Sequence, residues 1–215
     1  MAAAAHSPVN PREAIVGARL LLVTDPRPDL AARVEAAVRG GVDVVQLREK
    51  RTAAEVIRSL AEELREVCAR GGALFTVNDD VGLARLSRAD GVHLGQEDAP
   101  VALAREELGP DAVVGRSAGT VAEAHEALRE GADYLGVGTV FATPTKPDAE
   151  VAGLALVEEV AREELPLPWF AIGGITAETA GEVAAAGAPG FAVVRAILDA
   201  DDPEAAAREL RSLLG

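Results

Sequence analysis

The fold can be predicted from a pattern that is complete in one segment, Gly40-Gly41-Val42-Asp43-Val44-Val45-Gln46-Leu47-Arg48. A glycine pair ends an alanine- and arginine-rich helical segment, a short apolar run follows, and the run ends in polar side chains. Glycine is a common stop signal at the end of a helix. Because the apolar run hardly alternates with polar residues, it is typical of a parallel strand that is buried on both faces. The stretch therefore predicts a helix-to-strand connection followed by a buried strand.

The same pattern recurs along the rest of the chain. Gly71-Gly72, Gly131 and Gly187 also precede short apolar runs, and Ala/Glu/Arg-rich segments of helical period separate the runs. This alternation is the order expected of βα units. The predicted strands are Leu20–Asp25, Asp43–Arg48, Leu74–Asp79, Gly91–Gly95, Val113–Ser117, Tyr134–Gly138, Trp169–Gly174 and Phe191–Ala196. We therefore predict an α/β fold, a single (β/α)8 TIM barrel built around a parallel eight-stranded barrel.

The chain length and composition predict one domain. A chain of 215 residues is long enough for one barrel and too short for two ordinary domains. The hydrophobic fraction of 49% is sufficient for a buried core. We expect residues 15–215 to form the (β/α)8 barrel catalytic domain. Residues 1–14 contain two prolines and lack the apolar run of a signal peptide, so they are predicted to be a disordered N-terminal tail.

The charge balance restricts the partners. The formal net charge is −14, which disfavours binding to nucleic acid or to anionic membranes. No apolar stretch is long enough to predict a membrane span. Cys68 is the single cysteine, so no internal disulfide can form, and a reducing, cytoplasmic location is expected. We expect small-molecule substrates, no nucleic acid and no membrane, and outer helices rich in small residues that are compatible with a homo-oligomer.

Polar residues cluster where the apolar runs stop, from the second predicted strand to the eighth. They are Gln46, Arg48, Lys50, Asn78, Asp79, Gln96, Asp98, Ser117, Thr143, Thr145, Lys146 and Arg195, together with the pair Gly173-Gly174. In a closed parallel barrel these strand ends face one rim, where barrel enzymes build their active sites. Strand ends are often polar simply because they are exposed, but a run that includes so many strands predicts an active site at this rim.

Two carboxylates predict a metal site. Asp79 and Asp98 follow the third and fourth predicted strands, and neighbouring strands lie about 4.8 Å apart. Two hard oxygen ligands, completed by water and a substrate phosphate, suit Mg²⁺, with one ion per subunit. The alternative interpretation is that Asp79 caps the next helix.

Three basic residues and a glycine pair predict anion binding. Arg48, Lys50 and Lys146 supply positive charge to the rim of a very acidic protein, and such side chains suit phosphate oxygens. The alternative is that they form solvated ion pairs with neighbouring acidic residues. Gly173-Gly174 and the backbone around Val194-Arg195 lie where barrels commonly bind phosphate through main-chain N–H groups.

The nucleophiles of covalent catalysis are not evident. His93 lies inside the fourth predicted strand between Val92 and Leu94, so we interpret it as a hydrogen-bonded interior group and not as a base. No Ser-His-Asp set, Cys-His set or zinc-type cluster can be assembled from the sequence. Covalent catalysis and zinc chemistry are therefore not indicated.

Six blocks of the sequence resemble the signature blocks of the thiamine-phosphate synthase family, and they occur in the family's order between about Leu20 and Leu198. The blocks are Gln46-Leu47-Arg48-Glu49-Lys50, Val77-Asn78-Asp79, His93-Leu94-Gly95-Gln96-Glu97-Asp98, Gly115-Arg116-Ser117, Thr143-Pro144-Thr145-Lys146 and Ala171-Ile172-Gly173-Gly174-Ile175. The resemblance implies a Mg²⁺-dependent transferase. It would condense 4-amino-2-methyl-5-hydroxymethylpyrimidine diphosphate with 4-methyl-5-(2-phosphoethyl)thiazole by dissociative displacement, giving thiamine phosphate and diphosphate.

The resemblance also implies a role for each matching residue. The pyrimidine diphosphate would be bound by Gln46, Leu47, Arg48, Glu49, Lys50, Asn78, Ser117 and Lys146. Among these, the catalytic groups would be Arg48, Lys50, Lys146 and Ser117. The thiazole phosphate would be held by Thr143, Pro144, Thr145, Gly173, Gly174 and the backbone of Val194 and Arg195. The Mg²⁺ ligands would be Asp79 and Asp98.

Two positions depart from the family pattern. Gly119 stands where a Ser-x-His segment would place its histidine, and Arg195 stands where many members have a serine. The first departure disfavours the nearest alternative, a thiazole tautomerase of the same fold, which uses that histidine for proton transfer. A non-catalytic phosphate-ligand-binding barrel would not need the pair Asp79 and Asp98. A sugar-phosphate isomerase barrel would need a carboxylate or cysteine base at the rim, and none can be assigned.

Overall fold

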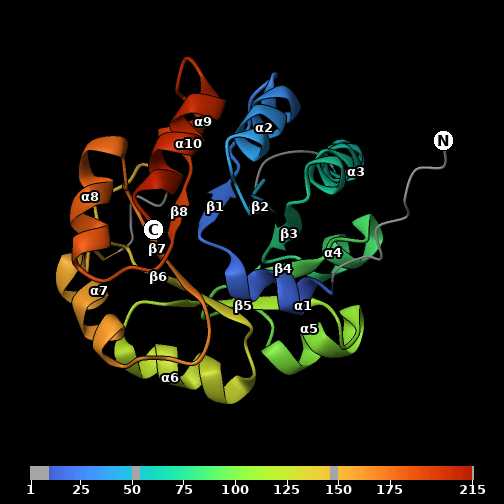
Figure 1. Cartoon of the computed structure of the whole chain (residues 1–215). Helices are drawn as coiled ribbons and strands as arrows, with labels where there is room; N and C mark the ends of the chain where they lie inside the picture. Colours follow the sequence, from blue (N-terminus) through green and yellow to red (C-terminus); the bar gives the residue numbers. More distant parts are fainter. Residues whose placement is uncertain (1–9, 50–53, 146–149, 215) are drawn as a thin grey trace, which may run out of the picture.

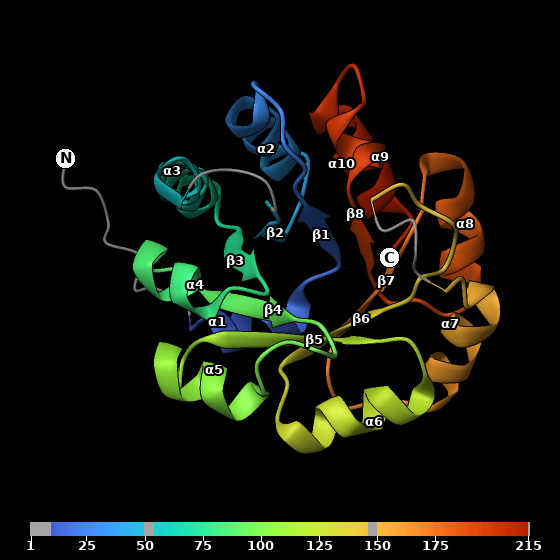
Figure 2. The same cartoon turned by 180° about the vertical axis from the view of Figure 1, so that it is seen from behind.

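Eight parallel strands form a closed barrel in the order of the sequence, and helices surround it (Figures 1 and 2). The structure is a computed structural model that describes residues 10–49, 54–145 and 150–214. The strands are β1 (Leu20–Val23), β2 (Val44–Leu47), β3 (Leu74–Asn78), β4 (Gly91–Leu94), β5 (Val113–Ala118), β6 (Tyr134–Val137), β7 (Trp169–Ile172) and β8 (Phe191–Val193). Each strand starts within one residue of the predicted start, so the predicted (β/α)8 barrel is confirmed.

The helices cover the outside of the barrel. They are α1 (Pro11–Ala14), the 3-10 helix η1 (Ile15–Gly17), α2 (Leu30–Arg39), α3 (Ala54–Gly71), α4 (Val81–Ser87), α5 (Val101–Leu108), α6 (Val121–Glu130), α7 (Gly153–Arg162), α8 (Ala177–Ala185), α9 (Arg195–Leu198) and α10 (Pro203–Ser212). Within the described ranges, no helix has both the length and the hydropathy to cross a membrane.

The end of the eighth strand differs from the prediction. The strand was expected to continue to Ala196, but β8 ends at Val193 and helix α9 begins at Arg195. The backbone leaves the extended conformation at Val194, where ψ is −84°. The prediction was wrong here because Val194 continues the apolar run and makes no side-chain cap that would mark the start of a helix.

The apolar residues form two cores, one on each side of the strands. The larger core lies between the strands and the helices and includes Leu20, Val45 and Leu47. The smaller core fills the interior of the barrel and includes Leu21, Val44 and other side chains of alternate strand positions. Because side chains alternate along a strand, each strand contributes to both cores, which explains why the apolar runs are nearly continuous.

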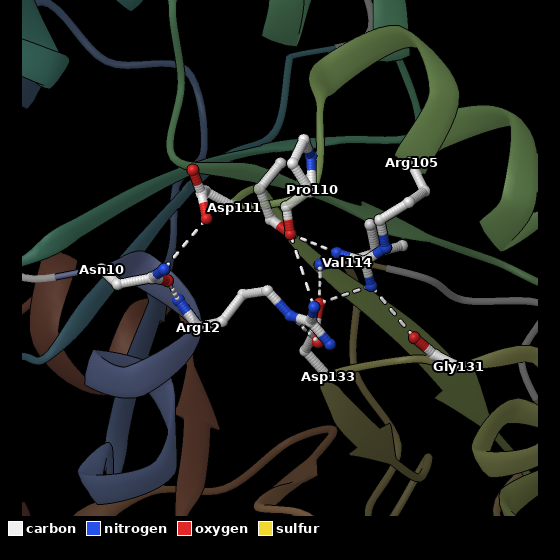
Figure 3. A network of polar contacts seen from close by, with 9 residues as sticks. Asn10, Arg12, Arg105, Pro110, Asp111, Val114, Gly131 and Asp133 are labelled. Carbon is white, nitrogen blue, oxygen red and sulfur yellow. Dashed lines mark hydrogen bonds and ion pairs between the residues drawn. The ribbon is translucent and has the colours of Figure 1, made fainter.

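The N-terminal segment closes the barrel where the strands begin. Ile15 is 1% exposed and packs into the interior core. The helix that precedes it is held by long-range contacts. Asn10 Nδ2 donates to Asp111 Oδ1 at 3.0 Å, Arg12 Nε lies 2.7 Å from Asp133 Oδ1, and Arg12 Nη1 donates to the carbonyl of Pro110 at 3.4 Å (Figure 3). The predicted disordered tail included these residues, and the prediction is wrong for residues 10–14. Residues 1–9 lie outside the described part of the chain.

Three aspartates stabilise the same end of the barrel by a repeated arrangement. Asp43, Asp90 and Asp133 come directly before β2, β4 and β6. Asp43 Oδ2 accepts the backbone N–H of Leu20 at 2.9 Å. Asp90 accepts from Phe75 and Asp133 accepts from Val114, each at 2.8 Å. Each carboxylate therefore binds the start of the preceding odd-numbered strand, and we call these three contacts the aspartate clasps.

Candidate active site

The opposite rim brings the ends of β2 and β3 together. Alternate side chains of β2 point into the barrel, so Gln46 follows the interior residue Val44. Gln46 is 4% exposed, and its Nε2 donates to Asn78 Oδ1 at the end of β3 at 2.7 Å. The two predicted binding residues are therefore joined in one hydrogen-bonded pair at this rim.

Arg48 connects β2 to the loop that follows β6. Its Nη2 donates to the carbonyl oxygen of Thr145 at 3.3 Å, although the two residues are 97 positions apart in the chain. Its backbone N–H donates to Thr24 Oγ1 at 3.0 Å, which fixes the strand end next to β1. A guanidinium has five N–H donors, so the contact with Thr145 leaves donors for a phosphate group. The geometry thus places the predicted basic residue Arg48 beside the predicted loop 143–145.

Asp79 and Asp80 have different roles after β3. Asp80 Oδ1 accepts the backbone N–H of Leu83 at 2.8 Å and is the N-cap of α4. Asp79 has a left-handed backbone with φ of 64°, and its N–H donates to the carbonyl of His93 at 2.8 Å. The helix cap that was considered as the alternative role of Asp79 is therefore formed by Asp80. An aspartate in a left-handed conformation is uncommon and costs free energy, as is often seen at functional sites.

A buried arginine holds the loop that contains Asp98. Asp98 Oδ2 accepts the backbone N–H of Gly95 at 2.6 Å, which closes the loop after β4. Arg116 is 7% exposed, and its Nη1 donates to the carbonyls of Gly95 and Ala99 at 2.8 and 3.3 Å. Gln96 Nε2 donates to the carbonyl of Ser117 at 2.5 Å. The position of Asp98 is therefore fixed from the neighbouring strand β5.

The donor set at the ends of β3 and β4 fits a Mg²⁺ ion that the substrate helps to bind. Asp79 and Asp98 are half-buried and follow strands that are hydrogen-bonded to each other. Among the described residues, no group of three or more His, Cys, Asp or Glu side chains could hold a metal by itself. Two hard oxygen ligands with space for water and phosphate oxygens are the usual protein contribution to a Mg²⁺ site. Asp79 and Asp98 would therefore hold the ion only together with water and a bound phosphate.

Ser117 lies above buried polar side chains in the interior. Its Oγ is 3.0 Å from His93 Nε2, and His93 Nδ1 is 3.1 Å from the hydroxyl of Tyr134. His93 is 7% exposed and Tyr134 is fully buried. The interpretation of His93 as a hydrogen-bonded interior group is confirmed. Its contact with Ser117, however, connects it directly to a predicted catalytic residue.

The loop after β6 packs against the end of β7, and this packing requires glycine. The backbone N–H of Phe141 donates to the carbonyl of Gly173 at 2.9 Å. Gly173 has a φ of 110°, and a Cβ atom there would lie 2.5 Å from Thr139 Cγ2. At Gly174 a Cβ atom would lie 2.7 Å from the carbonyl oxygen of Ala142. Close backbone packing therefore explains the glycine pair, and its predicted contact with a phosphate stays a prediction.

The remaining predicted residues lie in different environments. Leu47 is 1% exposed and packs into the outer core, so only its backbone could reach a ligand inside the rim. Arg195 is exposed at the start of α9, while Val194 packs partly against the interior core. Glu49, Thr143 and Thr145 are half-buried, and Pro144 is exposed. Lys50 and Lys146 lie outside the described residues.

The described residues contain no activated thiol at the rim. Cys68 is buried in α3, and burial raises the pKa of its thiol to about 12, so the thiolate is scarce at neutral pH. Gly119 donates its backbone N–H to Glu123 Oε2 at 2.6 Å. A Cβ atom at Gly119 would lie 3.4 Å from the same carboxylate oxygen.

Three interior residues were not predicted to belong to the site. His93, Tyr134 and Thr76 lie on β4, β6 and β3, and all three are buried polar residues in strands. Arg116 was likewise missed, although it is in one of the six blocks. A polar residue inside an otherwise apolar strand was the available signal, because burying such a group is costly without a hydrogen-bond partner.

Comparisons with known proteins show the family of this chain. The sequence pattern of the family described as thiamine monophosphate synthase matches residues 20–197. A thiamine-phosphate synthase of Synechocystis sp. is 49% identical over 91% of this chain and 57% of its own length. The thiamine-phosphate synthase of Thermobifida fusca is 47% identical over 94% of this chain and 95% of its own length.

A solved structure shows the same fold at substantial identity. Thiamine phosphate pyrophosphorylase from Pyrococcus furiosus superposes with a TM-score of 0.83, is 36% identical, and the match covers 94% of this chain and 96% of that one. The chain spans less than three fifths of the length of the relatives from Synechocystis, Synechococcus and Thermosynechococcus. It spans nearly the whole of the relatives from Thermobifida and Pyrococcus. The chain belongs to the thiamine monophosphate synthase family.

Proposed function

We propose that the protein is a thiamine-phosphate synthase that condenses the aminopyrimidine diphosphate with the thiazole phosphate. The observation that supports this most directly is the contact between Arg48 and the carbonyl of Thr145. It joins the residues predicted for the diphosphate to the loop predicted for the second phosphate. Two anionic substrates would then meet at one rim, as a condensation requires.

The proposed chemistry is a displacement at the methylene carbon of the pyrimidine. The bond between this carbon and the diphosphate oxygen breaks, and its electron pair leaves with the diphosphate. The ring nitrogen of the thiazole then forms the new bond with its lone pair, so the product is a thiazolium cation. The amino group of the pyrimidine ring stabilises the positive charge on the methylene carbon, so no strong general base is needed. The scarcity of activated nucleophiles at the described rim is consistent with this chemistry.

The residues of the rim would assist the departure of the diphosphate. Arg48, with Lys50 and Lys146, would neutralise charge that grows on the leaving oxygens, where fixed positive groups are most effective. Mg²⁺ held by Asp79 and Asp98 would supply further positive charge to the same diphosphate. Gln46 and Asn78 would orient the pyrimidine, since their mutual hydrogen bond fixes both amide groups. The homo-oligomer and the cytoplasmic location stay predictions.

The proposal is tested by a coupled assay with the purified chain. The protein is mixed with the pyrimidine diphosphate, the thiazole phosphate and Mg²⁺, and thiamine phosphate and diphosphate are measured together. We expect equal amounts of both products, their loss with EDTA, and their recovery with excess Mg²⁺. Absence of product under conditions where an established synthase is active would contradict the proposal. A parallel incubation with the thiazole tautomer alone would then test the tautomerase alternative.

A further inference from the structure

Arg116 is a buried charged residue in the apolar layer between the strands and the helices. It follows Val114 on the outward face of β5, and Val114 belongs to the outer core. Its Nε lies 3.5 Å from Glu130 Oε2 at the end of α6. Burying a charge is costly, and a buried ion pair seldom stabilises a fold more than apolar side chains would. The ion pair is therefore a weak reason for an arginine here, and its other contacts give a stronger one.

The other contacts of Arg116 close the loop that follows β4. Its Nη1 donates to the carbonyl of Gly95 at the start of this loop, and to the carbonyl of Ala99 near its end, at 2.8 and 3.3 Å. Arg116 can reach both because its Cα is paired with that of Leu94, the last residue of β4. A second contact to β5 comes from Gln96, whose side chain is exposed. Arg116 is therefore the buried link between the loop and β5.

Asp98 lies in this loop and is oriented by Gly95. Its Oδ2 accepts the backbone N–H of Gly95 at 2.6 Å, and its own backbone N–H donates to the carbonyl of Gly95 at 3.3 Å. A Cβ atom at Gly95 would lie 2.9 Å from Asp98 Oδ2, so the carboxylate packs closely against the backbone. The carbonyl of Gly95 thus accepts from both Asp98 and Arg116. The orientation of the carboxylate therefore depends on the position of Gly95, which Arg116 fixes.

Helix α5 does not hold the loop by a side-chain cap. Its N-cap residue is Pro100, which makes no side-chain hydrogen bond to the helix. The preceding helix α4 and the following helix α6 both begin with capping side chains, those of Asp80 and Thr120. In the loop before α5, the carbonyl of Ala99 is bound by Arg116 instead. Arg116 therefore supplies a fixed point that the loops before α4 and α6 obtain from their helix caps.

We propose that Arg116 is a positioning residue for the Mg²⁺ ligand Asp98, acting through the carbonyl groups of Gly95 and Ala99. The role of Asp98 as a ligand rests on the proposed function. Groups that orient a metal ligand from outside the coordination sphere commonly change the metal affinity about 10- to 100-fold when they are removed. Because the ion would be shared with a diphosphate, Arg116 should affect the binding of diphosphate with Mg²⁺ and not its binding without Mg²⁺.

Arg105 offers a matched control at the opposite rim. Its guanidinium also donates to two carbonyls, those of Ala112 and Gly131, at 2.5 and 3.0 Å. It is also paired with one carboxylate, that of Asp133, at 2.9 Å. Arg105 therefore resembles Arg116 in its charge and hydrogen bonds, but it acts where the strands begin, away from the proposed Mg²⁺ site.

The proposal is tested by calorimetric titration with inorganic diphosphate alone and with its Mg²⁺ complex. Arg116→Met keeps an unbranched side chain and removes every N–H donor. We expect its Kd for the Mg²⁺ complex to rise at least about tenfold, while its Kd for diphosphate alone stays within about twofold of the wild type. Arg105→Met should bind both forms like the wild type. An unchanged Kd in Arg116→Met, an equal rise for diphosphate alone, or the same rise in Arg105→Met would overturn the proposal.

Two further variants separate the carbonyl contacts from the ion pair. Arg116→Lys keeps the charge and N–H donors, so it should recover most of the affinity that Arg116→Met loses. Glu130→Gln removes the ion pair and leaves both carbonyl contacts, so it should bind the Mg²⁺ complex like the wild type. A loss in either variant as large as that in Arg116→Met would contradict action through the carbonyl groups.

Folding of every variant is checked by urea unfolding before titration. If Arg116→Met does not fold, the double variant Arg116→Met/Glu130→Met is titrated in its place with the same expected result. The double variant replaces the whole ion pair with apolar side chains, an exchange that buried pairs often tolerate.

Turnover gives a second readout that general damage to the structure would not produce. In Arg116→Met the KM for Mg²⁺ should rise, while kcat at saturating Mg²⁺ and the KM for the thiazole phosphate stay near the wild-type values, because excess metal refills a weakened site. A fall in kcat that saturating Mg²⁺ does not restore would contradict the positioning role. A wild type that binds diphosphate equally with and without Mg²⁺ would overturn the proposal. If the wild type binds the Mg²⁺ complex more tightly but makes no thiamine phosphate, the proposed function fails, while the titrations still decide the role of Arg116.

Discussion

The two rims of the barrel use the same residue type for different purposes. At the rim where strands begin, Asp43, Asp90 and Asp133 accept backbone N–H groups and hold the strands in place. At the rim where strands end, Asp79 adopts an uncommon left-handed backbone and Asp98 lies in a loop held by a neighbouring arginine. The three aspartates that precede apolar runs thus hold strands of the barrel in place, whereas Asp79 and Asp98, which follow apolar runs, are the proposed metal ligands. This contrast predicts that stability and activity can be changed separately.

The largest expected effect is on turnover at the rim where strands end. Asp98→Ala should lower kcat by at least about 10²-fold, because it removes a proposed ligand of the Mg²⁺ that would neutralise the leaving diphosphate. Asp98→Asn is the matched control, since its amide oxygen can still accept the Gly95 N–H while the negative charge is lost. Steady-state kinetics and urea unfolding would be measured for both variants. Wild-type turnover in Asp98→Asn would contradict the assigned role of the charge.

The second largest effect is expected on the free energy of unfolding, from a change at the rim where strands begin. The Asp133 side chain is 6% exposed and contacts Arg12, Arg105 and the backbone of Val114. Asp133→Asn should lower the free energy of unfolding by about 2 kcal/mol, the typical loss for hydrogen bonds to a charged group. Urea unfolding measures this loss, and kcat of the folded variant should equal that of the wild type. A large fall in kcat in an Asp133→Asn protein that is fully folded would contradict the separation of stability and activity between the two rims.

A smaller, pH-dependent effect is expected within the aspartate clasps. Burial raises the pKa of Asp90, while the Phe75 N–H and Arg65 lower it by less. The folded state therefore holds this proton to a higher pH than the unfolded state does, so this group's contribution to stability falls as the pH rises through the raised pKa. Asp90→Asn keeps an acceptor for Phe75 and should remove this decline. The decline would be measured as the urea midpoint of the wild type and of Asp90→Asn from about pH 4 to about pH 7. The same pH dependence in both proteins would show that Asp90 does not cause the decline.

The smallest effect is expected on the outer helices, away from both rims. Arg58 and Glu62 form an ion pair within α3, with side chains that are 59% and 51% exposed. Arg58→Ala should change the free energy of unfolding by less than about 0.5 kcal/mol, because exposed pairs contribute little. Chemical unfolding in low and high salt would measure it. If Arg58→Ala lowered the free energy of unfolding as much as Asp133→Asn does, the location of a residue at a rim would not explain how much it contributes to stability.

The sequence predicted the barrel well because its strands are local features. Each βα unit contains its own glycine stop and apolar run, so the starts of all eight strands were found. The error at residues 10–14 has a different origin. Asn10 and Arg12 contact residues that are 101 and 121 positions away, and local patterns do not contain such pairs.

The candidate site was predicted in part, and the gaps have physical reasons. The rim residues were predicted because they follow apolar runs, and Leu47 was included among them although its side chain packs into the outer core. Strand alternation would have shown this, because Gln46 and Arg48 take the inward positions on either side of Leu47. Tyr134 and Thr76 were missed because a tyrosine or threonine in a strand is ordinary. The contact between Tyr134 and His93 joins β4 and β6, two strands that local sequence patterns do not connect.

The aspartate clasps imply that the barrel is divisible. Each clasp joins an odd-numbered strand to the segment that leads into its successor, so the clasped pairs are β1 with β2, β3 with β4, and β5 with β6. Before β8 the equivalent position is Gly190, where a Cβ atom would lie 2.7 Å from the carbonyl oxygen of Arg19. A cut between β4 and β5 therefore leaves every clasp within one fragment. We expect the two half-barrels, produced as separate chains, to reassemble into a complete barrel more readily than fragments cut between β3 and β4.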